Sequence, residues 1–235
     1  MTSPNTTIDR LDWLGIAAQL DSEGYAELPG LLGADAARGL ARQAETSSAA
    51  RRVPLASSDL GRGNLCYFGA GLPAPLQVWR TAFYRHLAVI ANRWNDVLGM
   101  NGHYPVELDG FLQRNRKAGQ IQPQSYWCRL GEEDYVGLHQ RSEGEQVFPM
   151  QVVALLSEPG KDFRGGEFVM TEQRPHMQTR PMVLPLKLGD AAIIATAERP
   201  FKGTKGYYRV NLKHAISRVL HGERVGVELT FHDAR

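Results

Sequence analysis

The sequence predicts an α+β fold in which a jelly-roll β-barrel packs against a mainly helical N-terminal layer. Residues 75–99 carry large apolar side chains at three- and four-residue spacing, which predicts a long amphipathic helix. A shorter helix is expected near residues 105–116. From Ser125 onward the pattern changes to short apolar stretches between Gly and Pro turns, which is typical of antiparallel strands. Their number, about eight, is the usual strand count of a jelly roll.

Ahead of the long helix, residues 8–45 predict a helix, a short strand and a second helix. Gly24 ends the first helix, residues 25–28 alternate like a strand, and Asp35 can cap the second helix. Residues 51–73 are rich in Gly, Ser and Pro, so we expect a long surface loop there. The N-terminal part of the chain is therefore expected to be mainly helical.

Each predicted strand of the barrel is a short apolar stretch bounded by turn residues. One of them, residues 134–138, ends at His139. The others cover residues 126–130, 147–156, 167–170, 182–186, 191–195, 207–214 and 225–231. Because many short strands with little intervening helix must bury their inner faces against each other, we expect an antiparallel barrel.

The bulk composition indicates one compact domain over residues 1–235, with a helical part over 1–120 and the barrel core over 125–235. At 235 residues and 43% hydrophobic content, the chain can bury a core without disulfides. Two distant cysteines, no signal-peptide pattern and no long apolar run lead us to expect a cytoplasmic protein without a membrane partner. The net charge of +2 is too mild to indicate a nucleic-acid partner.

Histidine and arginine provide the candidate chemistry. His139 ends one predicted strand, and His214 ends another strand that lies far along the chain. A barrel can bring both imidazoles to its inner face, where they are suitable ligands for Fe(II) beside a carboxylate. Arg224, at the start of the last strand, can hold a carboxylate ligand through two parallel hydrogen bonds. The alternative, from the residues alone, is two structural histidines and a surface arginine.

Three stretches between Tyr126 and Ala234 carry a family resemblance: LHQRSEGEQVFPMQVVALLSEPGKDFRGGEFVMTEQRP, PLKLGDAAII and GYYRVNLKHAISRVLHGERVGVELTFHDA. Together with the N-terminal EGYAELPGLL, they resemble the prolyl-4-hydroxylase-like branch of the Fe(II)/2-oxoglutarate-dependent oxygenases. The resemblance implies a double-stranded β-helix with Fe(II) and 2-oxoglutarate as cofactors. It also implies oxidative decarboxylation of 2-oxoglutarate coupled to hydroxylation of a peptidyl residue or a small molecule.

Matched position by position, the resemblance gives each residue of the expected site a role. His139 and His214 match the two histidine ligands of the metal. Arg224 matches the basic residue that holds the C5 carboxylate of 2-oxoglutarate. Ser217 and Arg218 fall where the family lines the cosubstrate pocket.

The chain departs from this family at the metal site. The family's aspartate is expected two residues after His139, and that position holds Arg141. Leu130 stands where many relatives carry a tyrosine. Replacing a carboxylate with a guanidinium changes the charge beside a divalent ion by two units. Each unit-charge pair at about 4 Å is worth roughly 4 kcal/mol at an effective dielectric constant near 20, so Arg141 is expected to alter the site's chemistry.

Three readings of the altered site remain open. In the first, Glu143 or Glu145 supplies the missing carboxylate. In the second, iron binds weakly or not at all and the barrel is a ligand-binding or regulatory module. In the third, a two-histidine metal centre remains catalytic. The expected partner is a small molecule or a peptide, and repair of alkylated nucleic acid is disfavoured by the near-neutral charge and the absence of a basic stripe.

Overall fold

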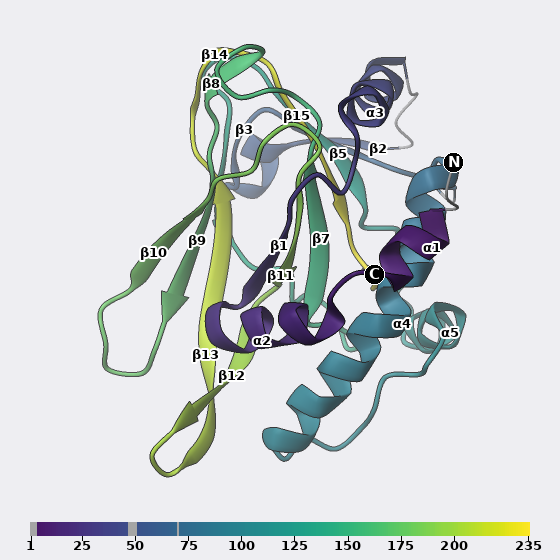
Figure 1. Ribbon diagram of the computed structural model, residues 1–235, viewed down its shortest axis with the longest axis vertical. Coiled ribbons are helices and arrows are strands. Elements are labelled where there is room, and N and C mark those ends of the chain that lie inside the picture. Colours follow the sequence, from purple (N-terminus) through teal and green to yellow (C-terminus); the bar gives the residue numbers. More distant parts are fainter. Residues whose placement is uncertain (1–3, 47–50, 70) are drawn as a thin grey trace.

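The computed structural model describes residues 4–46, 51–69 and 71–235. Two antiparallel sheets face each other and form the expected jelly roll, a double-stranded β-helix (Figure 1). Helices from the N-terminal half of the chain gather mainly on one side of this β structure. The prediction of an α+β jelly roll is confirmed.

Most strands are short, as the turn-rich sequence predicts. The larger sheet contains β1 (Tyr25–Leu28), β2 (Arg51–Pro54), β4 (Asn64–Tyr67), β5 (Tyr126–Leu130), β7 (Met150–Leu155), β11 (Ala191–Ala195) and β15 (Arg224–Leu229). The smaller sheet contains β3 (Gly61–Arg62), β6 (Tyr135–His139), β9 (Phe168–Gln173), β10 (Arg180–Leu184), β12 (Glu198–Gly203) and β13 (Gly206–Ile216). A separate two-stranded ladder joins β8 (Phe163–Gly165) and β14 (Val219–Gly222).

The first and last strands of the barrel core, β5 and β15, lie side by side in the interior of the larger sheet. The larger sheet runs β1-β11-β7-β15-β5-β4-β2, and the smaller one runs β10-β9-β13-β6-β3, with β12 also paired to β13. In β13 every second side chain is buried, including those of Leu212, His214 and Ile216. Because side chains alternate between the two faces of a strand, this pattern places His214 inside the barrel.

The helices are α1 (Pro4–Asp9), α2 (Trp13–Glu23), α3 (Ala34–Thr46), α4 (Ala74–Val97) and α5 (Leu108–Lys117), and a short 3₁₀ turn covers Leu55–Ser58. Figure 1 shows α1, α4 and α5 on the same side of the β structure. Trp79, Phe83 and Trp94 of α4 are buried, so the apolar stripe of this helix is core packing. None of the helices in the described ranges is long and apolar enough to cross a membrane.

The prediction of a surface loop over residues 51–73 is wrong for most of this segment. Strands β2, β3 and β4 lie there, and β4 pairs with β5 so that the larger sheet extends beyond the barrel core. Leu65, Cys66 and Tyr67 are buried in β4. Gly63 and Gly69 flank this apolar run closely, so the Gly-rich composition of residues 51–73 concealed the strand pattern. Residue 70 of the expected loop lies outside the described residues.

Candidate active site

Two histidines face each other inside the barrel. His139 is the last residue of β6, and its Cα lies opposite that of His214 in the neighbouring strand β13. Their ring centroids are 4.2 Å apart with an interplanar angle of 53°. His139 is 9% exposed and His214 is 1% exposed. The structure therefore brings together the two imidazoles that the sequence placed far apart along the chain.

The hydrogen bonds around the pair fix the tautomers. His139 Nδ1 lies 2.9 Å from the Gly137 carbonyl oxygen, which accepts its proton, so Nε2 keeps a lone pair. His139 Nε2 is buried and has no hydrogen-bond partner among the described residues. Burial, aided by the Arg141 charge, lowers the pKa of His139. Burial and the neighbouring His139 lower the pKa of His214 well below its ordinary value, so both rings are neutral.

A buried glutamine covers the second histidine. Gln151 is fully buried on β7, and its Nε2 atom lies 3.3 Å from His214 Nε2 and 2.9 Å from the carboxylate Oε2 of Glu228. In this amide orientation one hydrogen is donated to each acceptor, and Gln151 Oε1 and His214 Nδ1 are buried without a partner among the described residues. The carboxylate of Glu228 is thus joined to His214 through the Gln151 amide.

Arg141 extends its guanidinium into the same interior. It follows β6, and its backbone N–H donates to the Thr196 carbonyl oxygen at 3.0 Å. The guanidinium carbon lies 5.0 Å from the centroid of the Tyr126 ring, and Nη1 is 3.5 Å from the Tyr67 hydroxyl. Within the described part of the chain, Arg141 Nε and Nη2 are buried without a hydrogen-bond partner. A permanently charged group with unsatisfied donors therefore stands beside the histidine pair.

These residues do not complete the Fe(II) site that the family resemblance implies. An iron centre of this type needs two histidines and one carboxylate on one face of the ion. Across residues 4–46, 51–69 and 71–235, no group of three or more His, Cys, Asp or Glu side chains is placed to hold a metal. Glu143 and Glu145 are exposed on the loop after β6, and neither joins the histidines in such a group.

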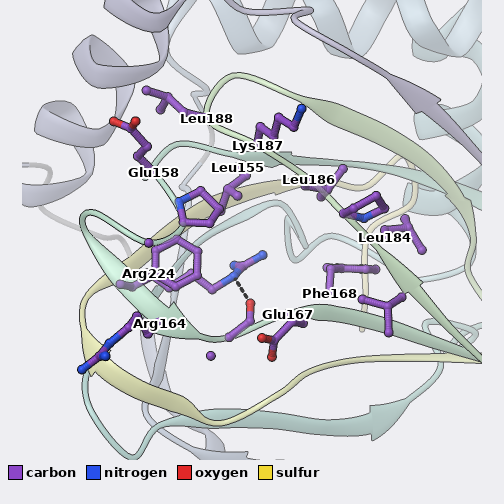
Figure 2. Close-up of a pocket in the computed structure, with 17 residues that line it drawn as sticks. Leu155, Glu158, Arg164, Glu167, Phe168, Leu184, Leu186, Lys187, Leu188 and Arg224 are labelled. Atoms are coloured by element: carbon purple, nitrogen blue, oxygen red, sulfur yellow. Dashed lines mark hydrogen bonds between the residues drawn. The ribbon is translucent and has the colours of Figure 1, made fainter.

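Arg224 lies at the other end of the barrel interior. It is the first residue of β15, its Cα is opposite that of Leu130, and it is 3% exposed. Its Nε atom donates to the Gly166 carbonyl oxygen at 2.8 Å (Figure 2). Gly166 has φ of +65°, and a Cβ atom there would come within 3.0 Å of Arg224 Cδ. Glycine is therefore required where this turn meets the arginine.

A cavity of about 840 Å³ opens beside Arg224, and Figure 2 shows the side chains that line it. A second, much smaller void of about 10 Å³, with room for about one water molecule, lies on the barrel side of Arg224. Phe168 borders both spaces, and its ring is parallel to that of His214 with centroids 6.0 Å apart. Phe168 therefore forms the wall between the large cavity and the histidine pair.

Ser217 and Arg218 are not brought to the histidines. Ser217 follows β13, and its Oγ accepts a hydrogen bond from the backbone N–H of Glu167 at 2.9 Å while its hydroxyl contacts the Glu167 carboxylate. Arg218 makes an exposed ion pair with Glu133 at 3.1 Å. Neither residue lines the cavity beside Arg224. The structure places Ser217 beside Glu167 at the cavity edge and Arg218 at the surface.

Sequence reasoning missed Gln151, Glu228 and Phe168. Gln151 and Glu228 are lone polar residues inside apolar strand segments, FPMQVVALL and VGVELTF. A polar side chain at such a position must find a buried partner, and this signal alone indicates an interior network. Phe168 carries no such signal, because an aromatic residue in a strand is ordinary core.

Comparisons with known proteins agree with this architecture. Residues 63–234 match the Oxygenase-NA family, which is described as "Oxygenase, catalysing oxidative methylation of damaged DNA". Over 167 residues the chain is 36% identical to an uncharacterized protein of Mycobacterium tuberculosis, found in strains CDC 1551 / Oshkosh and ATCC 25618 / H37Rv. The aligned part covers 71% of this chain and 72% of that protein.

Solved structures share the fold at low sequence identity. A Pseudomonas putida prolyl-4-hydroxylase has a TM-score of 0.57 and 13% identity, over 95% of this chain and 99% of that chain. A 2OG-Fe(II) oxygenase-family oxidoreductase from Burkholderia pseudomallei has a TM-score of 0.55 and 16% identity, over 96% and 93%. A Trichoplax adhaerens prolyl hydroxylase, solved with a hypoxia inducible factor peptide, has a TM-score of 0.54 and 13% identity, over 98% and 90%.

The family match covers most of the chain, including both histidines, Arg141 and Arg224. The solved structures show which fold the chain has, and the family match and the sequence relative show which family it belongs to. The chain therefore belongs to the Oxygenase-NA family and has the fold of the 2-oxoglutarate/Fe(II) oxygenases.

Proposed function

We propose that this chain is an altered member of its family that serves as a ligand-binding module and does not turn over 2-oxoglutarate. The observation that carries the proposal is the buried guanidinium of Arg141 beside a histidine pair that has no carboxylate ligand. In this reading His139, His214, Gln151 and Glu228 form a packed polar core, and ligand binding is left to the space outside it.

The charge of Arg141 supports this proposal. A divalent ion between the two imidazoles would meet a positive group in place of the usual negative one. With an effective dielectric constant near 20, each unit-charge pair at about 4 Å is worth roughly 4 kcal/mol, and the ion doubles that figure. Even after screening, several kcal/mol of metal affinity are lost relative to an aspartate at this position.

The packing of the interior supports it as well. The Gln151 amide donates to His214 Nε2, so a metal would first have to displace it. A five-carbon diacid that reached from Arg224 to the histidines would need far more room than the space of about 10 Å³ on the barrel side of Arg224. Phe168 would also have to move out of its position against His214.

A second candidate function is iron-dependent oxygenation. Two observations favour it: the family description names damaged DNA as the substrate, and His139 Nε2 is buried with a lone pair that no described residue uses. This candidate counters our expectation of no nucleic-acid partner. In this reading His139 and His214 hold the ion, and the ion with 2-oxoglutarate supplies the oxidising power for C–H hydroxylation.

Turnover of 2-oxoglutarate separates the two functions. Purified chain is incubated with Fe(II), ascorbate and 2-oxoglutarate, with and without alkylated single-stranded DNA, and succinate is quantified. We expect no succinate above the protein-free background. Iron-dependent succinate formation that alkylated DNA stimulates would overturn the proposal and establish the second candidate.

A further inference from the structure

The cavity beside Arg224 has a buried cation at its base. Arg224 is 3% exposed, and its Nε atom is held by the Gly166 carbonyl oxygen. Among the described residues, no carboxylate forms an ion pair with its guanidinium. Figure 2 shows the outer end of this side chain among the residues that line the cavity. A buried charged group without a counter-ion is costly, so an anion that reaches it gains a strong partner.

The carboxylates nearest this cation, Glu228 and Glu167, act on it through space without an ion-pair contact. Glu158 is paired with Arg38 at 2.9 Å and lies 3.3 Å from Lys161. Glu167 accepts a hydrogen bond from the neutral Ser217 hydroxyl, so its carboxylate keeps a negative charge at the exposed edge of the cavity. Arg164 and Lys187 line the cavity with exposed side chains, and they add positive charge near its mouth. Arg224, Arg164 and Lys187 outweigh the carboxylate of Glu167, so the net charge that a ligand would meet is positive.

The walls of the cavity are mainly apolar. Leu155, Phe163, Phe168, Leu184 and Leu186 contribute hydrocarbon surface around Arg224. The volume of about 840 Å³ lies within the range of small-molecule sites, which combine an apolar lining with a few polar anchors. A ligand that fills this space has a hydrocarbon body and one acidic end.

We propose that this cavity binds an aliphatic monocarboxylate, with its carboxylate on Arg224 and its hydrocarbon chain along the Leu and Phe wall. The inference rests on the proposed function and names the ligand class of the binding module. Phe168 separates this site from the histidine pair, so binding needs no metal. A short diacid such as 2-oxoglutarate fits less well, because its short body leaves most of the apolar wall uncovered.

The test uses octanoate as the probe, in buffer that contains EDTA. Isothermal titration measures its affinity, and octan-1-ol and 2-oxoglutarate are titrated in parallel. We expect octanoate to bind more tightly than either. Methyl-labelled leucine NMR locates the site independently of any variant, and the resonances of Leu184 and Leu186 are expected to shift during the octanoate titration.

Two variants test the cationic anchor. Arg224→Gln removes the bidentate partner, so we expect octanoate affinity to fall at least about tenfold. Because Arg224 is buried, Lys187→Glu provides a second test at an exposed cavity residue, with an expected loss of about threefold. Arg209→Gln removes a charge outside the cavity and is expected to bind as the unmodified chain does.

Several results would overturn the inference: no octanoate binding, leucine shifts elsewhere in the barrel, equal affinity for octan-1-ol, tighter binding of 2-oxoglutarate, or affinity that neither Arg224→Gln nor Lys187→Glu changes. Because the titration contains no iron, its failure is distinct from a failure of the proposed function, which succinate formation would reveal.

Discussion

His232 makes the stability of this fold depend on pH. Its side chain is 4% exposed near the C-terminus, and its Nδ1 atom accepts a hydrogen bond from the Phe148 backbone N–H at 3.2 Å. Burial, followed by the charges of Arg141 and Arg80, lowers the pKa of His232 to about 4 from 6.5. The folded state therefore holds this ring in its neutral form throughout the physiological range.

The sign and size of the effect follow from proton linkage. Below pH 6.5 the unfolded chain takes up a proton at this histidine, whereas the folded chain does so near pH 4. The stabilisation is therefore complete above pH 6.5 and is lost as the pH falls towards 4. A pKa difference of about two and a half units corresponds to about 3 kcal/mol, of which about 2.5 kcal/mol is lost by pH 4.5.

Urea unfolding of His232→Asn measures this contribution. Asparagine keeps an acceptor for the Phe148 N–H but does not titrate. Between pH 7 and pH 4.5, we expect the unmodified chain to lose about 2 to 3 kcal/mol more unfolding free energy than the variant. The lowered pKa values of His139 and His214 act in both proteins, so the difference isolates His232. His221→Asn, at an exposed histidine, is the control. Equal pH dependence in His232→Asn and the unmodified chain would refute this reasoning.

Three further substitutions test the packing. Arg199→Met removes a fully buried guanidinium that donates to the carbonyl oxygens of Asp21 and Ser22 and pairs with buried Glu172. We expect this variant to lose about 3 to 5 kcal/mol of unfolding free energy in urea. The control Arg209→Met, at an exposed arginine, should stay within about 0.5 kcal/mol of the unmodified chain. Gly165→Ala places a Cβ atom 2.3 Å from the Arg218 carbonyl oxygen at φ of +71°, so its thermal midpoint should fall, and an unchanged midpoint would show that the turn relaxes freely. Phe168→Ala deletes a buried ring, and we expect it to lower the unfolding free energy by about 3 to 5 kcal/mol. It should also open the space between Arg224 and the histidines to solvent. Unaltered hydrogen exchange of the His214 amide would contradict this second expectation.

The sequence predicted the elements whose pattern is local. The stripe of α4 and the apolar runs of β5 and β11 each carry enough repeats to set helix or strand and to mark their ends. Strand positions alone left two structural histidines as an alternative. The family resemblance supplied the expectation that His139 and His214 converge, and the pairing of β6 with β13 brings them opposite each other. Family resemblance then supplied the reason to look for a third ligand at residue 141.

Other features depend on contacts that no local pattern encodes. Strand β4 pairs with β5 and in turn pairs with β2, whereas β3 pairs with β6 in the other sheet, so tertiary pairing overrode the glycine-rich composition of this segment. Arg218 turns to Glu133 on the surface because its position after β13 alternates outward, which a motif alignment does not register. The role of Gln151 between His214 and Glu228 arises from three strands that are distant in sequence.

We attribute the proposed loss of the iron centre to Arg141, and metal titration tests this attribution directly. Anaerobic addition of Fe(II) and then 2-oxoglutarate to the purified chain should give none of the weak visible absorption of a metal-chelated keto-acid. Arg141→Asp restores a carboxylate two residues after His139, and we expect this variant to bind Fe(II) measurably more tightly than the unmodified chain. A clear charge-transfer band in the unmodified chain, which Arg141→Asp does not strengthen, would contradict the account.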